Sequence, residues 1–107
     1  MKIRQLRMLA DACDEGSLSG AAKRNGVSVQ NVSKAMSDLE DELGRPLFVR
    51  SGRGVAPTDV ARALLPYART ALKAFDLCES FGSSLRGEEP NGGSNPSRTK
   101  KGSAAWQ

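Results

Sequence analysis

The amino-acid sequence predicts a mainly α-helical fold: three short helices, a two-stranded β-hairpin and a long final helix. Apolar residues recur at three- and four-residue spacing up to residue 43, which is the period of helices that pack on one side. Glycine-containing turns separate these segments. A short hydrophobic stretch with a glycine-rich tip follows at residues 46–57, and alanine and leucine then predominate at residues 58–82.

The first two helices have clear boundary signals. The apolar face of the first helix, at about residues 3–15, is made of Ile3, Leu6, Leu9, Ala10 and Cys13. Ser17 is a good N-cap for a second, shorter helix, and Gly26 is placed to end it in the left-handed conformation. Ser28 is then placed to cap a third helix, so the sequence predicts two helices joined by a tight turn.

The third helix, at about residues 29–43, has one apolar face and one polar face. Its apolar face consists of Val32, Met36, Leu39 and Leu43. The opposite face carries amides, hydroxyls and one amine near its start: Gln30, Asn31, Ser33, Lys34 and Ser37. These groups hydrogen-bond to base edges and phosphates, although such a face is also typical of a solvated surface helix. The preceding helix and glycine turn favour a helix-turn-helix that binds DNA.

The segment after Gly44 predicts a β-hairpin. Residues 46–50 and 55–57 suit two short strands, and residues 51–54 suit a turn. Between Arg45 and Arg53 there are three arginines and no acidic residue. A basic hairpin beside a recognition helix suits contact with the DNA backbone or minor groove, while the alternative is a merely solubilising tip. The fold prediction is therefore a winged helix-turn-helix, with a DNA-binding set of Ser28, Val29, Gln30, Asn31, Ser33, Lys34, Ser37, Arg50 and Arg53.

Motifs spread over residues 2–80 match those of one family in combination. They include Ile3-Arg4-Gln5-Leu6-Arg7, Gly16-Ser17-Leu18, Ala21-Ala22, Val27-Ser28, Ser33-Lys34, Leu39-Glu40-Asp41-Glu42-Leu43-Gly44, Leu47-Phe48-Val49-Arg50, Pro57-Thr58 and Leu64-Leu65-Pro66-Tyr67-Ala68. The chain thereby resembles the DNA-binding domain of LysR-type transcriptional regulators. This resemblance implies a bacterial transcription factor that binds dyad-symmetric operators on double-stranded DNA as a dimer or tetramer.

Three positions depart from the family pattern. Val29-Gln30 stands where most relatives have Gln-Pro, and Ser37-Asp38 stands where basic or amide residues are common. Ala61 replaces a glycine that is usual just after the threonine. These differences bear on the DNA sequence that is recognised more than on the fold.

The long helix at residues 58–82 carries an apolar stripe with coiled-coil spacing. Thr58 is placed to cap this helix, and Pro66 inside it predicts a bend rather than an end. A small head cannot cover so long a stripe, which favours antiparallel pairing with a second copy, as the resemblance also implies. Burial within the monomer is the alternative. The predicted dimerisation residues are Ala61, Leu64, Leu65, Ala68, Leu72 and Phe75.

The predicted organisation is a DNA-binding domain at residues 1–57, a linker and dimerisation helix at 58–82 and a disordered tail at 83–107. The whole chain has 107 residues, a net charge of +4 and a pI of about 9.4, which favours polyanionic partners. LysR-type regulators normally continue into an effector-binding domain, and we expect no small-molecule effector site in this chain. A fragment, a truncated product and a small stand-alone protein all remain open.

Composition argues against catalysis. The sequence has no histidine, and Cys13 and Cys78 are far apart on apolar helix stripes, so we expect no enzyme activity, no cofactor and no metal. No membrane span or signal sequence is evident, which predicts a cytoplasmic protein. The resemblance implies that it is bacterial and nucleoid-associated when bound. Two functions remain. One is a sequence-specific transcription factor, and the other is an interaction protein that pairs through residues 58–82 with a full-length relative and inactivates it.

Overall fold

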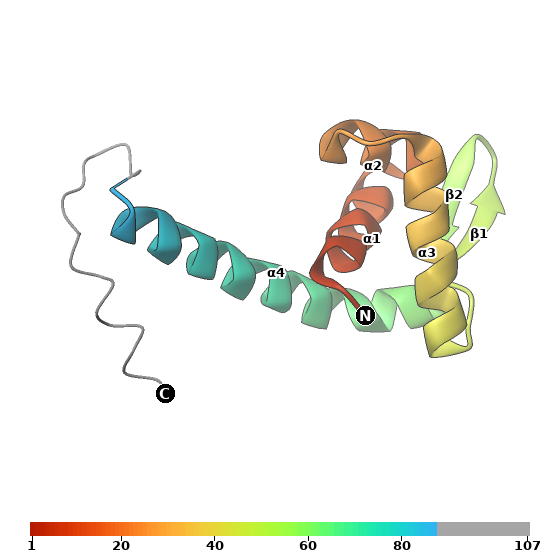
Figure 1. Ribbon diagram of the computed structural model, residues 1–107. Helices are drawn as coiled ribbons and strands as arrows, with labels where there is room; N and C mark the ends of the chain where they lie inside the picture. The colour runs from red at the N-terminus through yellow and green to blue at the C-terminus, as the bar shows by residue number, and fades with distance from the viewer. Residues whose placement is uncertain (88–107) are drawn as a thin grey trace. The chain divides into compact units, whose positions relative to one another are not determined.

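The computed structural model describes residues 1–87 of the chain, and the elements follow the predicted order (Figure 1). They are α1 (Ile3–Glu15), α2 (Leu18–Asn25), α3 (Val29–Leu43), β1 (Phe48–Ser51), β2 (Gly54–Pro57) and α4 (Asp59–Leu85). One compact unit comprises Met1–Leu72, and a second begins at Lys73. The fold is the winged helix-turn-helix that the sequence predicts, followed by the long helix. Most of the predicted tail, from residue 88 onward, lies outside the described residues.

The ends of the short helices are fixed by the residues that the sequence singled out. The Ser17 hydroxyl accepts the Gly20 N–H at 2.9 Å, and the Ser28 hydroxyl accepts the Asn31 N–H at 3.1 Å. Each hydroxyl thereby satisfies one of the N–H groups that a helix start leaves without an intrahelical partner. Gly26 ends α2 with φ of 65°, a left-handed conformation that costs glycine little. The predicted caps of α2 and α3 are confirmed.

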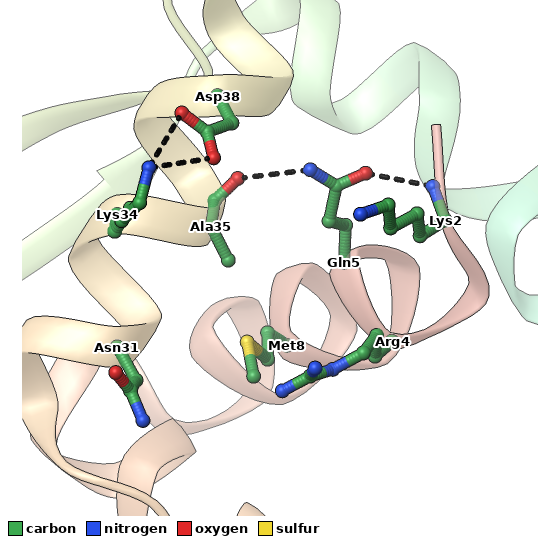
Figure 2. Close-up of a pocket in the computed structure, with 8 residues that line it drawn as sticks. All are labelled: Lys2, Arg4, Gln5, Met8, Asn31, Lys34, Ala35 and Asp38. Carbon is green, nitrogen blue, oxygen red and sulfur yellow. Dashed lines mark hydrogen bonds and ion pairs between the residues drawn. The ribbon is translucent and has the colours of Figure 1, made fainter.

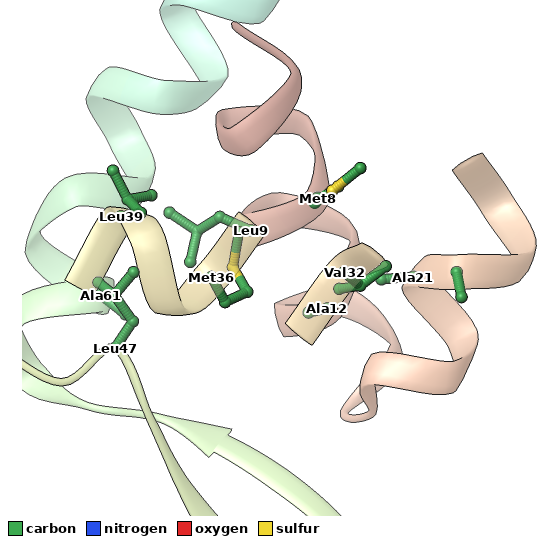
Figure 3. Close-up of a cluster of buried hydrophobic side chains, with 10 residues drawn as sticks. Met8, Leu9, Ala12, Ala21, Val32, Met36, Leu39, Leu47 and Ala61 are labelled. Atoms are coloured by element: carbon green, nitrogen blue, oxygen red, sulfur yellow. The ribbon is translucent and has the colours of Figure 1, made fainter. Parts of the chain in front are cut away.

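The main hydrophobic core lies where α1, α2 and α3 meet (Figure 3). Its fully or nearly fully buried members are Met8, Leu9, Ala12, Ala21, Ala22, Val32, Met36, Leu39, Leu47 and Ala61. Three predicted core residues of α3, Val32, Met36 and Leu39, are therefore confirmed, while Leu43 is partly buried against the cluster. Met8 and Ala12 do not belong to the stripe that the spacing indicated. They are buried because α1 is covered on more than one side.

A second cluster packs α1 against the first half of α4. It is formed by Leu6 and Ala10 from α1 and by Ala68 and Leu72 from α4, with Leu64 and Leu65 partly buried around it. Ala61 belongs to the main core.

Of the predicted dimerisation residues, Ala61, Ala68 and Leu72 are buried within the chain, and Leu64 and Leu65 are partly buried. The sixth, Phe75, is half-buried. Their pairing with a second copy stays a prediction.

Helix α4 is longer than predicted. The Thr58 hydroxyl accepts the Ala61 N–H at 3.3 Å, which confirms Thr58 as the cap. The helix continues through Pro66, as expected, and also through Gly82 to Leu85. The predicted end at residue 82 was therefore too early, because a glycine inside a helix lowers its stability without ending it.

The hairpin has a two-residue loop at Gly52 and Arg53. Its strands are antiparallel, with Phe48 opposite Pro57 and Ser51 opposite Gly54. Gly52 adopts φ of 49°, a value that few other residues tolerate, so the tight loop depends on this glycine. The first strand begins at Phe48 and not at Pro46, since Leu47 is fully buried in the main core.

Candidate nucleic-acid interface

The polar face of α3 points to solvent. Because Val32, Met36 and Leu39 are buried, the residues on the other side of the helix cannot contact the core. All the residues predicted to bind DNA are exposed: Ser28, Val29, Gln30, Asn31, Ser33, Lys34, Ser37, Arg50 and Arg53. Val29 is apolar and yet 42% exposed on the first turn of the helix. The helix thus presents hydroxyls, amides, an amine and one aliphatic group.

The hairpin is tied to the loop after α1 by its backbone. The Val55 N–H donates to the Gly16 carbonyl at 3.0 Å. A side chain at Gly54 would collide with that same carbonyl, so only glycine allows the strand to come so close. Gly54 was predicted to lie in the turn, but it begins β2, and its contact with Gly16 was not predicted. The sequence signal for this contact is that positions 16 and 54 are both glycine, but no local pattern shows that these two glycines meet.

The base of the hairpin is tied to α3 and to the start of α4. The Glu40 carboxylate accepts the Leu47 N–H at 2.7 Å, and the Thr58 hydroxyl donates to the Pro46 carbonyl at 2.8 Å. The Thr58 N–H donates to the Leu47 carbonyl at 2.9 Å. Glu40 adjoins the exposed acids Asp41 and Glu42 in the sequence, but its own side chain is partly buried. Its carboxylate holds the hairpin in a fixed position beside α3.

A groove separates α3 from the hairpin and brings together predicted residues from both. Its volume is about 540 Å³, and its lining includes Val29, Ser33, Arg50 and Arg53. Two arginines from the hairpin therefore share one concave surface with the first two turns of α3. Guanidinium groups are permanently charged and suit phosphate oxygens, so this groove places two groups of that kind beside the polar side of α3.

A second groove lies between α1 and α3 (Figure 2). It is lined by Lys2, Arg4, Gln5, Met8, Asn31, Lys34, Ala35 and Asp38. Gln5 bridges its two walls, because its side-chain oxygen accepts the Lys2 N–H at 2.7 Å and its amide donates to the Ala35 carbonyl at 3.5 Å. Neither Lys2 nor Arg4 belongs to the predicted DNA-binding set. The structure adds both to the surface beside Asn31 and Lys34.

Charge is unevenly distributed along the exposed face of α3. The first half of the helix carries no acid and includes Lys34, whereas the second half carries Asp38, Asp41 and Glu42. Lys34 Nζ lies 3.2 Å from one oxygen of Asp38, and the terminal amine of Met1 lies 2.7 Å from Glu42. A polyanion is therefore favoured at the beginning of α3 and disfavoured at its end.

The described residues offer little for catalysis. Burial raises the pKa of the half-buried Cys13 thiol above its usual range, and a nearby Arg69 only partly offsets this. Among residues 1–87 no three His, Cys, Asp or Glu side chains are grouped so that they could hold a metal ion. In that same part of the chain, no helix combines the length and the hydropathy that spanning a membrane requires.

The family description "Bacterial regulatory helix-turn-helix protein, lysR family" matches residues 3–62 of the chain. The chain belongs to the LysR family. It is 40% identical over 72 residues to the small neutral protease regulatory protein of Streptomyces coelicolor, a match that covers 67% of this chain and 22% of that protein. It is 37% identical over 93 residues to the HTH-type transcriptional regulator CzcR of Bacillus cereus, covering 86% of this chain and 31% of the relative. The chain thus spans less than a third of these relatives.

Solved structures of LysR-family DNA-binding domains share the fold. The CbnR DNA-binding domain in complex with DNA superposes with a TM-score of 0.69 at 33% identity, covering 77% of this chain and 94% of that one. The BenM DNA-binding domain bound to benA site 1 DNA gives a TM-score of 0.70 at 27% identity, covering 83% and 100%. The chain therefore corresponds to the DNA-binding part of this family.

Proposed function

We propose that the protein is a sequence-specific DNA-binding transcription factor that inserts the first half of α3 into the major groove. The observation that carries this proposal is the shared groove in which Val29 and Ser33 of α3 meet Arg50 and Arg53 of the hairpin. An α-helix fits the major groove of B-DNA, and a neighbouring basic loop reaches the flanking backbone or minor groove. DNA complexes of the CbnR and BenM domains support the same assignment.

The side chains at the start of α3 suit direct readout of bases. Gln30 and Asn31 carry amides that pair with the donor and acceptor edge of adenine, and Lys34 suits the acceptors of guanine. Val29 is 42% exposed and suits contact with a thymine methyl group. Asp38, Asp41 and Glu42 lie further along, so we expect the helix to enter the groove with its first two turns and to leave the phosphates at its acidic end.

We further propose that the protein binds a dyad-symmetric operator as a homodimer. One helix reads only a few base pairs, while two related by a twofold axis read a dyad at fixed spacing. The candidate dimer surface comprises the predicted residues of α4 that are only partly buried, Leu64, Leu65 and Phe75, together with the exposed apolar face of the second half of α4, formed by Leu77, Phe81 and Leu85. The last three residues recur every four positions and therefore share one side of the helix.

The test is binding to duplexes selected by the protein from a random pool. We expect log affinity to fall linearly with log salt, by about 0.9 per phosphate neutralised. Gln30→Ala and Lys34→Ala should reduce discrimination between selected and scrambled duplexes. Arg53→Ala should weaken binding to both more evenly, because it acts on the backbone. Recovery of no enriched sequence, or variants without effect, would contradict the proposal.

A second function uses the exposed apolar face of α4 without DNA. In that case the chain pairs with a full-length relative and keeps it from its operator. The acidic second half of α3 and the exposed Phe81, at 66%, favour this alternative. It predicts no DNA affinity for the isolated chain and loss of DNA binding by a relative on mixing, so the duplex selection distinguishes the two functions.

A further inference from the structure

The Lys34–Asp38 pair occupies the exposed side of α3, among the residues proposed to read DNA (Figure 2). Lys34 Nζ lies 3.2 Å and 3.4 Å from the two carboxylate oxygens of Asp38. The two residues are one helical turn apart, and their side chains are 75% and 51% exposed. The pair is thus held by local helix geometry and not by burial. Any DNA that reaches Lys34 therefore also meets the Asp38 carboxylate.

The pair restricts which acceptors Lys34 can bind. A lysine ammonium has three N–H donors, and the two oxygens of Asp38 occupy two of them at most. The remaining donor can reach a neutral acceptor, such as guanine O6 or N7, while the pair stays formed. A phosphate in the same place brings a negative charge close to the carboxylate and is repelled.

We propose that Asp38 determines the specificity of Lys34, reserving it for a guanine in the major groove and withholding it from backbone phosphates. The inference rests on the proposed function, since it names the base that one residue of α3 reads. Phosphates have other cations available. Arg4 and Lys2 line the same groove from α1, and Arg50 and Arg53 line the groove at the hairpin. Asp38 thus gives Lys34 a base-reading role, which differs from the phosphate-binding role of the cations around it.

Asp38→Asn tests this division. The full chain is titrated by fluorescence anisotropy against two duplexes of equal length and composition, one selected by the wild type and one scrambled. For the scrambled duplex we expect affinity to rise about fivefold, since a nearby like charge is removed. Its salt slope should steepen by about 0.9, the value of one more phosphate contact. Affinity for the selected duplex should change less, so the ratio of the two affinities falls.

Asp41→Asn is the matched control. Asp41 is an exposed acid on the same helix and forms no ion pair with Lys34, so this variant changes the net charge equally and leaves the pair intact. We expect it to preserve the affinity ratio. Equal effects of the two variants would overturn the inference, because net charge alone would explain them. An Asp38→Asn ratio equal to that of the wild type would overturn it as well.

A separate experiment tests whether Lys34 binds a guanine. Replacing guanines of the selected duplex one at a time by 7-deazaguanine removes N7. At one position this should weaken binding by the wild type and leave Lys34→Ala unaffected. If every position weakens both proteins alike, the guanine assignment is wrong while DNA binding stands. If the wild type binds no duplex at all, the proposed function fails and this inference fails with it.

Discussion

The two halves of α4 both carry apolar residues but differ in how these residues are buried. In the first half, Ala61, Ala68 and Leu72 are buried against the rest of their own unit. In the second half, Leu77 is 67% exposed, Phe81 is 66% exposed and Leu85 is 44% exposed. Periodicity identifies an apolar side of a helix but not the partner that covers it. Part of the coiled-coil stripe in the first half packs on α1, where Tyr67 is nevertheless 75% exposed, and the second half exposes the row formed by Leu77, Phe81 and Leu85.

The largest effect should come from truncating the packed half. Leu72→Ala removes a side chain that is 8% exposed beside Leu6 and Ala10, and should lower the free energy of unfolding by about 2–3 kcal/mol. The matched change Leu77→Ala should cost less than about 0.5 kcal/mol, because that side chain is already in water. Urea denaturation of both variants at a concentration where the protein is monomeric measures the difference. Similar losses would mean that the two halves are not distinct.

A charge on the exposed half should act on association instead. Phe81→Asp should weaken homodimerisation by at least about thirtyfold, the size expected for an aromatic residue at the centre of an interface. The unfolding free energy of the monomer should hardly change, since Phe81 is 66% exposed. Sedimentation velocity over a concentration series measures the association. Ser80→Asp adds the same charge on a neighbouring side of the helix and should leave the dimer largely intact; dissociation by both variants would argue against this face.

The smallest effect should come from the ion pair that joins the packed half to α1. Arg69 lies 3.0 Å from Asp14, and the two side chains are 50% and 42% exposed. Arg69→Ala should therefore cost only about 0.5 kcal/mol of stability, and the loss should shrink in high salt. Asp59→Ala breaks a pair with Arg62 that lies within α4, and it should cost less still because the Asp59 side chain is 98% exposed. A larger cost for Asp59→Ala than for Arg69→Ala would contradict the view that α1 is what holds this half.

The sequence was most informative where structure is set locally. The bounds of α1, α2 and α3 were predicted because each carries its own caps or stop signal, such as Ser17 and Gly26. The sequence was less informative where a residue far away in the chain determines whether a side chain is buried. Met8 is buried because α1 is enclosed on two sides, and periodicity assumes one. Gly82 indicated a helix end because glycine is a poor helix former, although the helix tolerates it.

The candidate site divides in the same way. Exposure of Gln30 and Lys34 follows from the helix period, although their contacts with DNA remain predictions. The supports of the hairpin do not follow from any period. The Glu40 contact with Leu47 crosses from α3 to the strand, and the Val55 contact with Gly16 joins segments far apart in the chain. Such bonds depend on which segments the fold brings together, and the residue types in a single sequence do not predict this.

The bond from Val55 to Gly16 has a consequence for how binding preferences change during evolution. The hairpin is fastened to Gly16 through main-chain atoms, with a glycine that admits no side chain, and its base is fastened by Glu40 and Thr58, so its placement does not depend on the side chains in the first two turns of α3. The distance between the hairpin arginines and the start of α3 is therefore set by the fold and does not change with the side chains on the first two turns of α3. Under the proposed function, we expect substitutions at Gln30 or Ser33 to alter the preferred bases while the arginines keep their reach along the duplex.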